Sequence, residues 1–137
     1  CGLRPGIKGV SENITVRSII GRFLEHSRIY YVLNGGQEEV YLSSADWMPR
    51  NLNDRVELLF PVESARHIEK IKHILELCLT DNVGAHIMLT NGGYRRAAGR
   101  DKKPVSVQEI LAKEARRAAR QEKLPIEQRL KPIYRKD

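Results

Sequence analysis

The chain has 137 residues, of which 41% are hydrophobic and 30% are charged, and this balance is typical of a single globular domain. Its apolar runs are shorter than the roughly 20 residues that a membrane-spanning helix needs, which argues against an integral membrane protein. We also expect no secretory signal peptide, because no charged segment followed by an apolar one opens the sequence.

The net charge of +7 is concentrated in the last third of the chain. Residues 1–93 carry ten Lys and Arg against eleven Asp and Glu, whereas residues 94–137 carry fourteen against six. A basic tail can bind nucleic acid, a membrane surface or another polyanion, or it can be a solvated surface helix. Because four glutamates interrupt the basic run, we favour the solvated helix and do not expect nucleic acid as a partner.

The cysteines and histidines do not indicate a metal site. Two cysteines and four scattered histidines lack metal-ligand spacing, so we expect neither a structural zinc site nor a disulfide. This cysteine usage fits a reducing cytoplasm. The sequence begins with Cys1 rather than Met, and its first residues, CGLRPG, read as the middle of a longer sequence. We therefore expect a piece of a longer polypeptide, with part of any active site outside it.

The first part of the chain predicts loops and short strands. Glycines and a proline predict an extended loop over residues 1–13, and residues 46–53, with a proline and two asparagines, predict an irregular segment. Asn34, Gly35 and Gly36 predict a turn that joins two strands into a hairpin. Strands are predicted over 15–20, 28–33, 39–43, 55–60 and 85–90.

Two helices are predicted. Apolar residues at three- and four-residue spacing after Ser64 predict a helix that ends at Asp81. Ser106 and Glu109 form a capping box that opens a second helix, and the basic residues 94–104 before it predict a loop. Strands followed by a crossover helix and a further strand favour the α/β class, with a mixed β-sheet flanked by helices.

The hairpin brings together polar residues that are distant in the sequence. If it turns through two or three residues, His26 falls beside Ser44 or Ala45, and Arg28 falls beside Leu42 or Ser43. A one-residue slip would move these side chains to the opposite face, so the shared end is better determined than the exact pairs. A histidine near arginines, hydroxyls and a carboxylate can act as a nucleophile or general acid–base on phosphorus.

The neighbouring residues suit phosphate. Arg28, Arg50 and Arg55 could clamp phosphate oxygens with their forked donors, and Asp46 could orient the imidazole or pair with an arginine. Spacing alone equally permits a structural cluster of salt bridges around a hydrogen-bonded histidine. No Walker-type or G-x-G-x-x-G loop is present. We expect Trp47 to anchor the core rather than to stack on a base.

The same stretch resembles a known family. The motifs SENI, GRFLEHSRIY, YLSSADWMPRN and the following RVE occur in the order found in the C-terminal catalytic domain of bacterial polyphosphate kinase, the long-chain-forming type. The resemblance covers about residues 1–90. It implies a phospholipase-D-like C-terminal catalytic domain core over residues 1–93, followed by a basic loop and helical tail over residues 94–137.

The resemblance implies reversible transfer of the terminal phosphate of ATP to inorganic polyphosphate, through a phosphohistidine intermediate and with Mg²⁺. His26 matches one of the family's two essential histidines and is implied to contact the ATP phosphates. The phosphorylated histidine and the Mg²⁺ ligands are implied to lie in the preceding domain. The implied partners are ATP, polyphosphate, the upstream domains and further copies of the full-length enzyme, in the cytoplasm or peripherally at the inner membrane.

The expected site therefore has His26 as its catalytic residue and Asp46 as an orienting carboxylate, with no metal ligand in this sequence. The expected ATP and phosphate ligands are His26, Arg28, Ser44, Arg50 and Arg55. We expect the sequence alone to have little or no kinase activity. Two alternatives remain open, namely a phospholipase-D-like phosphodiesterase domain and a non-catalytic module whose basic tail binds a polyanion.

Overall fold

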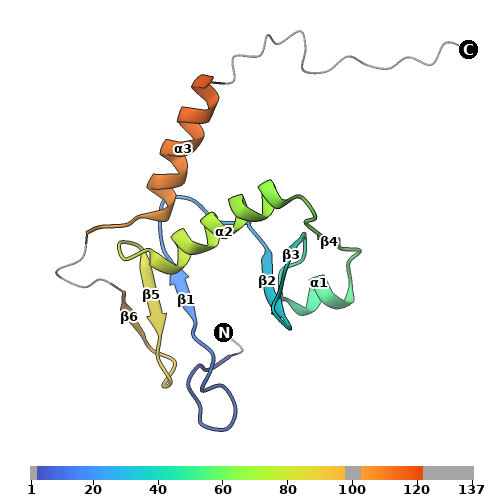
Figure 1. Cartoon of the computed structure of the whole chain (residues 1–137). Coiled ribbons are helices and arrows are strands. Elements are labelled where there is room, and N and C mark those ends of the chain that lie inside the picture. Colours follow the sequence, from blue (N-terminus) through green and yellow to red (C-terminus); the bar gives the residue numbers. More distant parts are fainter. Residues whose placement is uncertain (1–2, 98–102, 122–137) are drawn as a thin grey trace, which may run out of the picture.

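Two small antiparallel sheets and three helices make up the fold of the residues that the structure describes (Figure 1). The structure, a computed structural model, describes residues 3–97 and 103–121. One sheet has the strand order β1 (Arg17–Ile19), β5 (Ala85–Met88), β6 (Tyr94–Arg96). The other has the order β2 (Ile29–Asn34), β3 (Gln37–Ser43), β4 (Leu59–Pro61). The helices are α1 (Pro49–Asn53), α2 (Ala65–Thr80) and α3 (Val107–Gln121).

The hairpin of β2 and β3 turns through two residues, the shorter of the two predicted loops. Asn34 faces Gln37, and Ile29 faces Leu42 at the other end. Gly35 and Gly36 have φ angles of +58° and +93°. Two consecutive left-handed residues are what a tight hairpin turn with the right-handed twist of its strands requires, and glycine adopts them without strain. This turn therefore determines which side chains meet at the open end of the hairpin.

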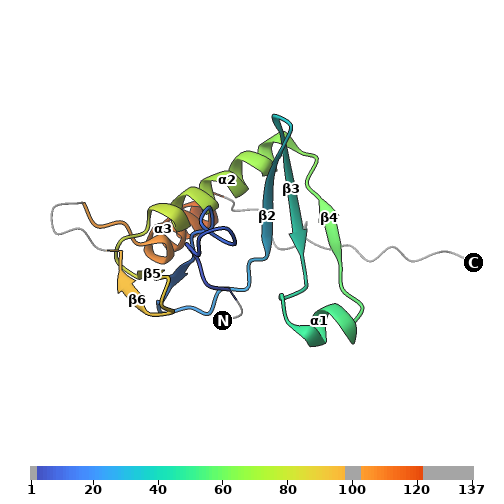
Figure 2. The ribbon, with the colours of Figure 1, turned by 90° about the horizontal axis from the view of Figure 1, so that it is seen from below.

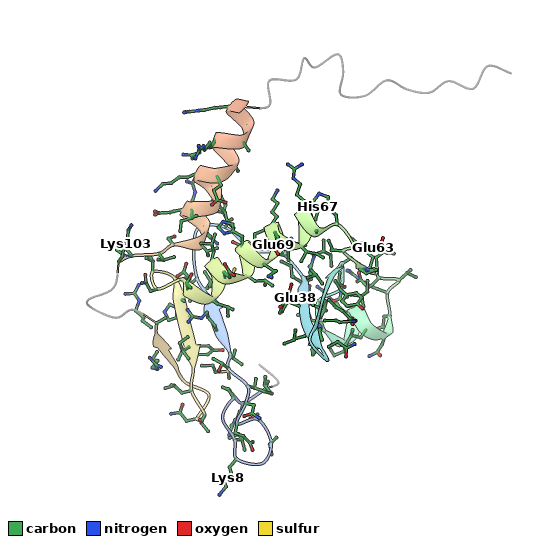
Figure 3. All side chains as sticks on the ribbon, in the orientation of Figure 1. Lys8, Glu38, Glu63, His67, Glu69 and Lys103 are labelled. Atoms are coloured by element: carbon green, nitrogen blue, oxygen red, sulfur yellow. The ribbon has the colours of Figure 1, made fainter. Side chains whose placement is uncertain are left out.

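Helix α2 links the two sheets, and its predicted bounds are confirmed. It begins after Ser64 and ends at Asp81, and Figure 2 shows it running past both sheets. A mostly apolar cavity of about 300 Å³ lies between it, β1, β2 and α3. Lys72 of α2 also binds Glu38 of β3 at 2.8 Å, and Glu38 lies below the helix in Figure 3.

Few apolar residues are buried, and they come from elements of both sheets and from the helices α2 and α3. Val40, Ala45, Ile71, Ala85 and Val107 are buried, whereas many large apolar side chains on β2, β4 and the loops are exposed. No helix among residues 3–97 and 103–121 is long and apolar enough to span a bilayer.

Buried Asp81 joins α2, β5 and α3. Its Oδ1 accepts the backbone N–H groups of Val83, Gly84 and Ala85 at 2.8–3.1 Å. Its Oδ2 accepts the N–H of Val107, the first residue of α3, at 2.8 Å. A carboxylate at a helix N-terminus satisfies an otherwise unpaired N–H and interacts favourably with the helix dipole. This contact positions α3 relative to the rest of the described chain.

The α/β class is confirmed, but several details of the sequence prediction are wrong. The strands form two antiparallel sheets rather than one mixed sheet. Residues 46–53 are not irregular throughout, because Pro49 begins α1 at a position where its missing N–H costs nothing. Residues 94–96 form β6 instead of a loop, and the strand predicted over 55–60 begins only at Leu59. Residues 98–102, within the predicted loop, and Cys1 lie outside the described residues.

Candidate functional site

The predicted site residues lie at the end of the hairpin where β2 begins and β3 ends, next to α1 (Figure 2). The Ser43 N–H donates to the carbonyl of Arg28 at 3.0 Å, and the Ser44 N–H donates to the carbonyl of Leu58. These main-chain bonds extend the ladder of the sheet beyond its strands. The two polar segments that are distant in the sequence therefore converge at this end.

An ion pair between Arg28 and Asp46 lies at the centre of this cluster. The Arg28 Nε donates to Asp46 Oδ1 at 2.8 Å, with 27% and 44% of the two side chains exposed. This hydrogen bond lowers the pKa of Asp46, and the positive charges of Arg28, His26 and Arg50 lower it further. The same bond raises the pKa of Arg28. Asp46 is therefore the carboxylate toward which three of the predicted site residues direct positive charge.

A second carboxylate, Glu57, belongs to the cluster and was missed by the sequence analysis. It accepts hydrogen bonds from the Ser44 hydroxyl and from Asn51 Nδ2. These bonds lower the pKa of Glu57, and the charges of Arg55 and Arg28 lower it further. Through Ser44 and Asn51, Glu57 therefore connects the end of β3 with α1. Its position in the RVE motif was a sequence signal for Glu57, but its partners follow only from the hairpin register and the position of α1.

The Ser44 hydroxyl is engaged within the chain. It donates to Glu57 and accepts the N–H of Leu58 at 2.9 Å, so it fixes the glutamate beside the arginines. Asn51, buried in α1, donates to the same Glu57 carboxylate through its Nδ2. Among the described residues, the Oδ1 of Asn51 has no hydrogen-bond partner. A buried amide oxygen without a partner is uncommon and costs free energy.

The cations of the cluster remain accessible. His26, Arg50 and Arg55 are exposed. In the part of the chain that the structure describes, no hydrogen bond or ion pair holds the side chains of these three residues. Arg28 uses its Nε for Asp46, which leaves its two terminal amino groups for a ligand. Guanidinium groups with unpaired forked donors are well suited to bind phosphate oxygens.

Trp47 does not anchor the core, contrary to the sequence prediction. Its side chain is on the surface, with 78% exposed. Its ring stacks on Tyr30 with centroids 6.1 Å apart, and its indole N–H donates to the Tyr30 hydroxyl at 2.6 Å. The pair borders a shallow pocket of about 320 Å³ that Arg28 and Asp46 also line.

The arrangement is one open surface that presents positive charge. Asp46 orients Arg28, Glu57 is bonded to Ser44 and Asn51, and Arg50, Arg55 and His26 are exposed in the same part of the chain. Such a surface can bind an anion with several oxygens and stabilise charge on a group in transfer. Among the described residues, no group of three or more His, Cys, Asp and Glu side chains could hold a metal ion.

Comparison with known proteins gives one consistent family. The model of the family described as polyphosphate kinase C-terminal domain 2 matches residues 1–108. A polyphosphate kinase of Pseudomonas aeruginosa is 64% identical over 96 residues, which are 70% of this chain and 14% of that protein. A polyphosphate kinase of Pseudomonas putida is 56% identical over 112 residues, which are 81% of this chain and 15% of the relative.

A solved structure agrees with these matches. The crystal structure of polyphosphate kinase from Porphyromonas gingivalis superposes with a TM-score of 0.73 and 38% sequence identity, over 81% of this chain and 17% of that one. This likeness supports the predicted phospholipase-D-like α/β class. The chain spans only about one seventh of the length of the curated relatives that it matches.

Proposed function

Because this chain belongs to the polyphosphate kinase C-terminal domain family, we propose that it forms one wall of the ATP and phosphate site of a polyphosphate kinase. The observation that carries the proposal is the ion pair of Arg28 with Asp46 at the end of the hairpin, next to α1 with Arg50 and to the bonded pair of Ser44 and Glu57. The rest of the site would come from the part of the enzyme that this sequence does not span.

In the proposed site the arginines bind the phosphate chain. The terminal amino groups of Arg28 and the guanidinium groups of Arg50 and Arg55 would take the oxygens of the β- and γ-phosphates. Asp46 holds Arg28 through the arginine Nε, which leaves the two terminal amino groups of that guanidinium for phosphate oxygens. Ser44 would act mainly through Glu57, because its hydroxyl is bonded to that carboxylate.

The proposed reaction is a reversible phosphoryl transfer in two steps. The bond between the γ-phosphorus and the bridging oxygen of ATP breaks, ADP leaves with the electron pair, and the phosphoryl group bonds to a histidine nitrogen outside this sequence. The terminal oxygen of a polyphosphate chain then displaces that nitrogen and forms the new P–O bond. His26 would lie beside the transferred group and give a hydrogen bond or proton to the leaving oxygen of ADP.

The proposal extends to the metal, the partners and the location that the family resemblance implies. Residues 3–97 and 103–121 offer no group of carboxylates and imidazoles that fits Mg²⁺, so its ligands would lie outside them, and none of the roles above depends on the ion. The partners would be ATP, polyphosphate, the upstream domains and further copies of the enzyme. We place this enzyme in the cytoplasm, with peripheral association at the inner membrane as a further proposal.

The test is synthesis of polyphosphate from ATP by the full-length enzyme that contains this sequence. His26→Ala is expected to lower the rate by about 10²-fold or more, the usual size of a general acid–base contribution. His67→Ala is the matched control, because His67 is an exposed histidine in the first turn of α2 and is not among the predicted site residues. Near-normal synthesis by His26→Ala would reject the proposed role.

A further inference from the structure

Gln108 of α3 makes an unusual contact with the segment that leads to His26. Its Oε1 accepts the backbone N–H of Phe23 at 3.0 Å, and its Nε2 donates to the Phe23 carbonyl at 2.8 Å. The same Nε2 donates to Glu25 Oε1 at 2.9 Å. One side-chain amide thus pairs with both polar groups of a peptide 85 residues away in the sequence. It also holds the side chain immediately before His26.

Gly21 provides the space for this contact. A Cβ atom at position 21 would lie 2.4 Å from Gln108 Oε1 and 2.7 Å from its Cδ. Its backbone is not in the left-handed region, so glycine is needed here for space rather than for conformation. The end of the Gln108 side chain could swing away from an added methyl group, but it would then lose its bonds to Phe23 and Glu25.

The segment between β1 and β2 depends on this contact. Residues 21–28 form neither helix nor strand, and Phe23 and Leu24 are exposed, at 54% and 85%. The Ile20 N–H bonds to the Gly84 carbonyl before the segment, and the Arg28 carbonyl accepts from Ser43 at its end. Between these points, the hydrogen bonds found in the described part of the chain are those to Gln108.

The first turn of α3, which carries Gln108, is held in place by hydrogen bonds to Asp81 and Asn82. Gln108 is the second residue of α3, and the preceding Val107 is buried and bonded through its N–H to Asp81. Asn82 adds bonds to the Lys103 carbonyl and the Val105 N–H on the approach to the helix. The position of the first turn of α3 is therefore set by α2, and Gln108 transmits that position to the segment 21–28.

We propose that Gln108 is a positioning residue for His26, and this inference rests on the function proposed above. By holding the Phe23 peptide and the Glu25 carboxylate, Gln108 fixes the backbone that carries His26 relative to Arg28 and Asp46 at the other end of the segment. The first turn of α3, within the basic tail predicted from the sequence, then forms part of the phosphate site. Gln108 acts through His26 and does not touch ATP.

A double-mutant cycle in ATP affinity distinguishes positioning from general stabilisation. In the full-length enzyme, Gln108→Leu is expected to weaken ATP binding by about tenfold and to lower kcat/KM by up to about 10²-fold, because small misplacements of a catalytic group are costly. Added to His26→Ala, it should weaken ATP binding by less than about twofold further, since its effect passes through the imidazole. Glu109→Gln, at the next and exposed position of α3, is the control and should match the wild type.

A second pair of variants decides the question even if Gln108→Leu does not fold. Gln108→Glu keeps the acceptor for the Phe23 N–H but sets a carboxylate against both Glu25 and the Phe23 carbonyl, so it should also weaken ATP binding. Glu25→Gln added to Gln108→Glu restores the donor–acceptor pair at position 25, while the Phe23 carbonyl still lacks its donor, so it should recover part of the loss in ATP affinity, at least about twofold. Absence of recovery would overturn the inference, as would an equal loss from Gln108→Leu with and without His26. Retained synthesis by His26→Ala would instead reject the proposed function.

Discussion

Replacing Asp81 by asparagine should loosen the start of α3. The buried carboxylate accepts three N–H groups on Oδ1 and the Val107 N–H on Oδ2. Asparagine keeps one acceptor oxygen, which can serve the first three. Its amide nitrogen is a donor and would face the donor of Val107, so one buried N–H loses its partner.

The expected cost follows from that single lost bond. A buried N–H without a partner costs about 1–3 kcal/mol, and the bond lost here is to a charged acceptor, so we take about 2 kcal/mol. This corresponds to a roughly thirtyfold larger population of the state in which the first turn of α3 is detached. The global unfolding of a longer, multidomain chain is not suited to the measurement, because it is not a two-state process.

Hydrogen exchange followed by mass spectrometry measures the local opening directly. In the full-length enzyme carrying Asp81→Asn, peptides that cover the first turn of α3 should lose about thirtyfold in protection, while those of the β2–β3 hairpin should change little. Glu76→Gln, an exposed position of α2, is the control. Unchanged protection of the Val107 amide would refute this account of how α3 is held.

The remaining predictions concern the site and the free thiol. Arg28→Lys should lower kcat/KM for ATP by about tenfold or more, because one ammonium group cannot serve both Asp46 and a phosphate; kinetics within twofold of the wild type would contradict this. The lowered pKa of Asp46 means that its ionised form is favoured by folding. The wild type should therefore be locally more stable than Asp46→Asn at pH 5–8, and the difference should disappear as the pH falls below the ordinary value of 3.8, as followed by hydrogen exchange in the β2–β3 hairpin corrected for the intrinsic effect of pH. Burial raises the pKa of the Cys78 thiol, so at pH 8 iodoacetamide should modify Cys78 more slowly than free cysteine, and equal rates would count against that burial. Residues 1–137 expressed alone should form no measurable polyphosphate from ATP, and robust synthesis would reject the shared site.

The parts of the fold that the sequence predicted well are those encoded by local patterns. The apolar spacing after Ser64 predicts α2, and the two consecutive glycines at 35 and 36 allow the two-residue turn that fixes the hairpin register. That register brings Arg28 beside Ser43, so the convergence of the site follows from the length of a single turn. The resemblance to polyphosphate kinase, which the family match confirms, added the assignment of the phosphate ligands, which stays a prediction.

The parts that could not be predicted depend on long-range contacts. The strand β6 consists of Tyr-Arg-Arg, without alternating apolar residues, and it forms because its main chain pairs with β5. Gln108 belongs to no recognisable motif, and Glu57, although it ends the RVE motif, acquires its role through Ser44, 13 residues away in the sequence. Trp47 is exposed, although tryptophan after a strand commonly packs inside. Composition alone says nothing about such pairings.

A calorimetric titration of the full-length enzyme with ATP, and in parallel with adenosine, tests the central claim most directly. If the cluster around Asp46 binds the phosphate chain, Arg55→Ala and His26→Ala should each weaken ATP binding by about tenfold and leave adenosine binding unchanged. Equal losses for both ligands, or ATP binding as tight as in the wild type, would contradict the assignment of this surface to the phosphates.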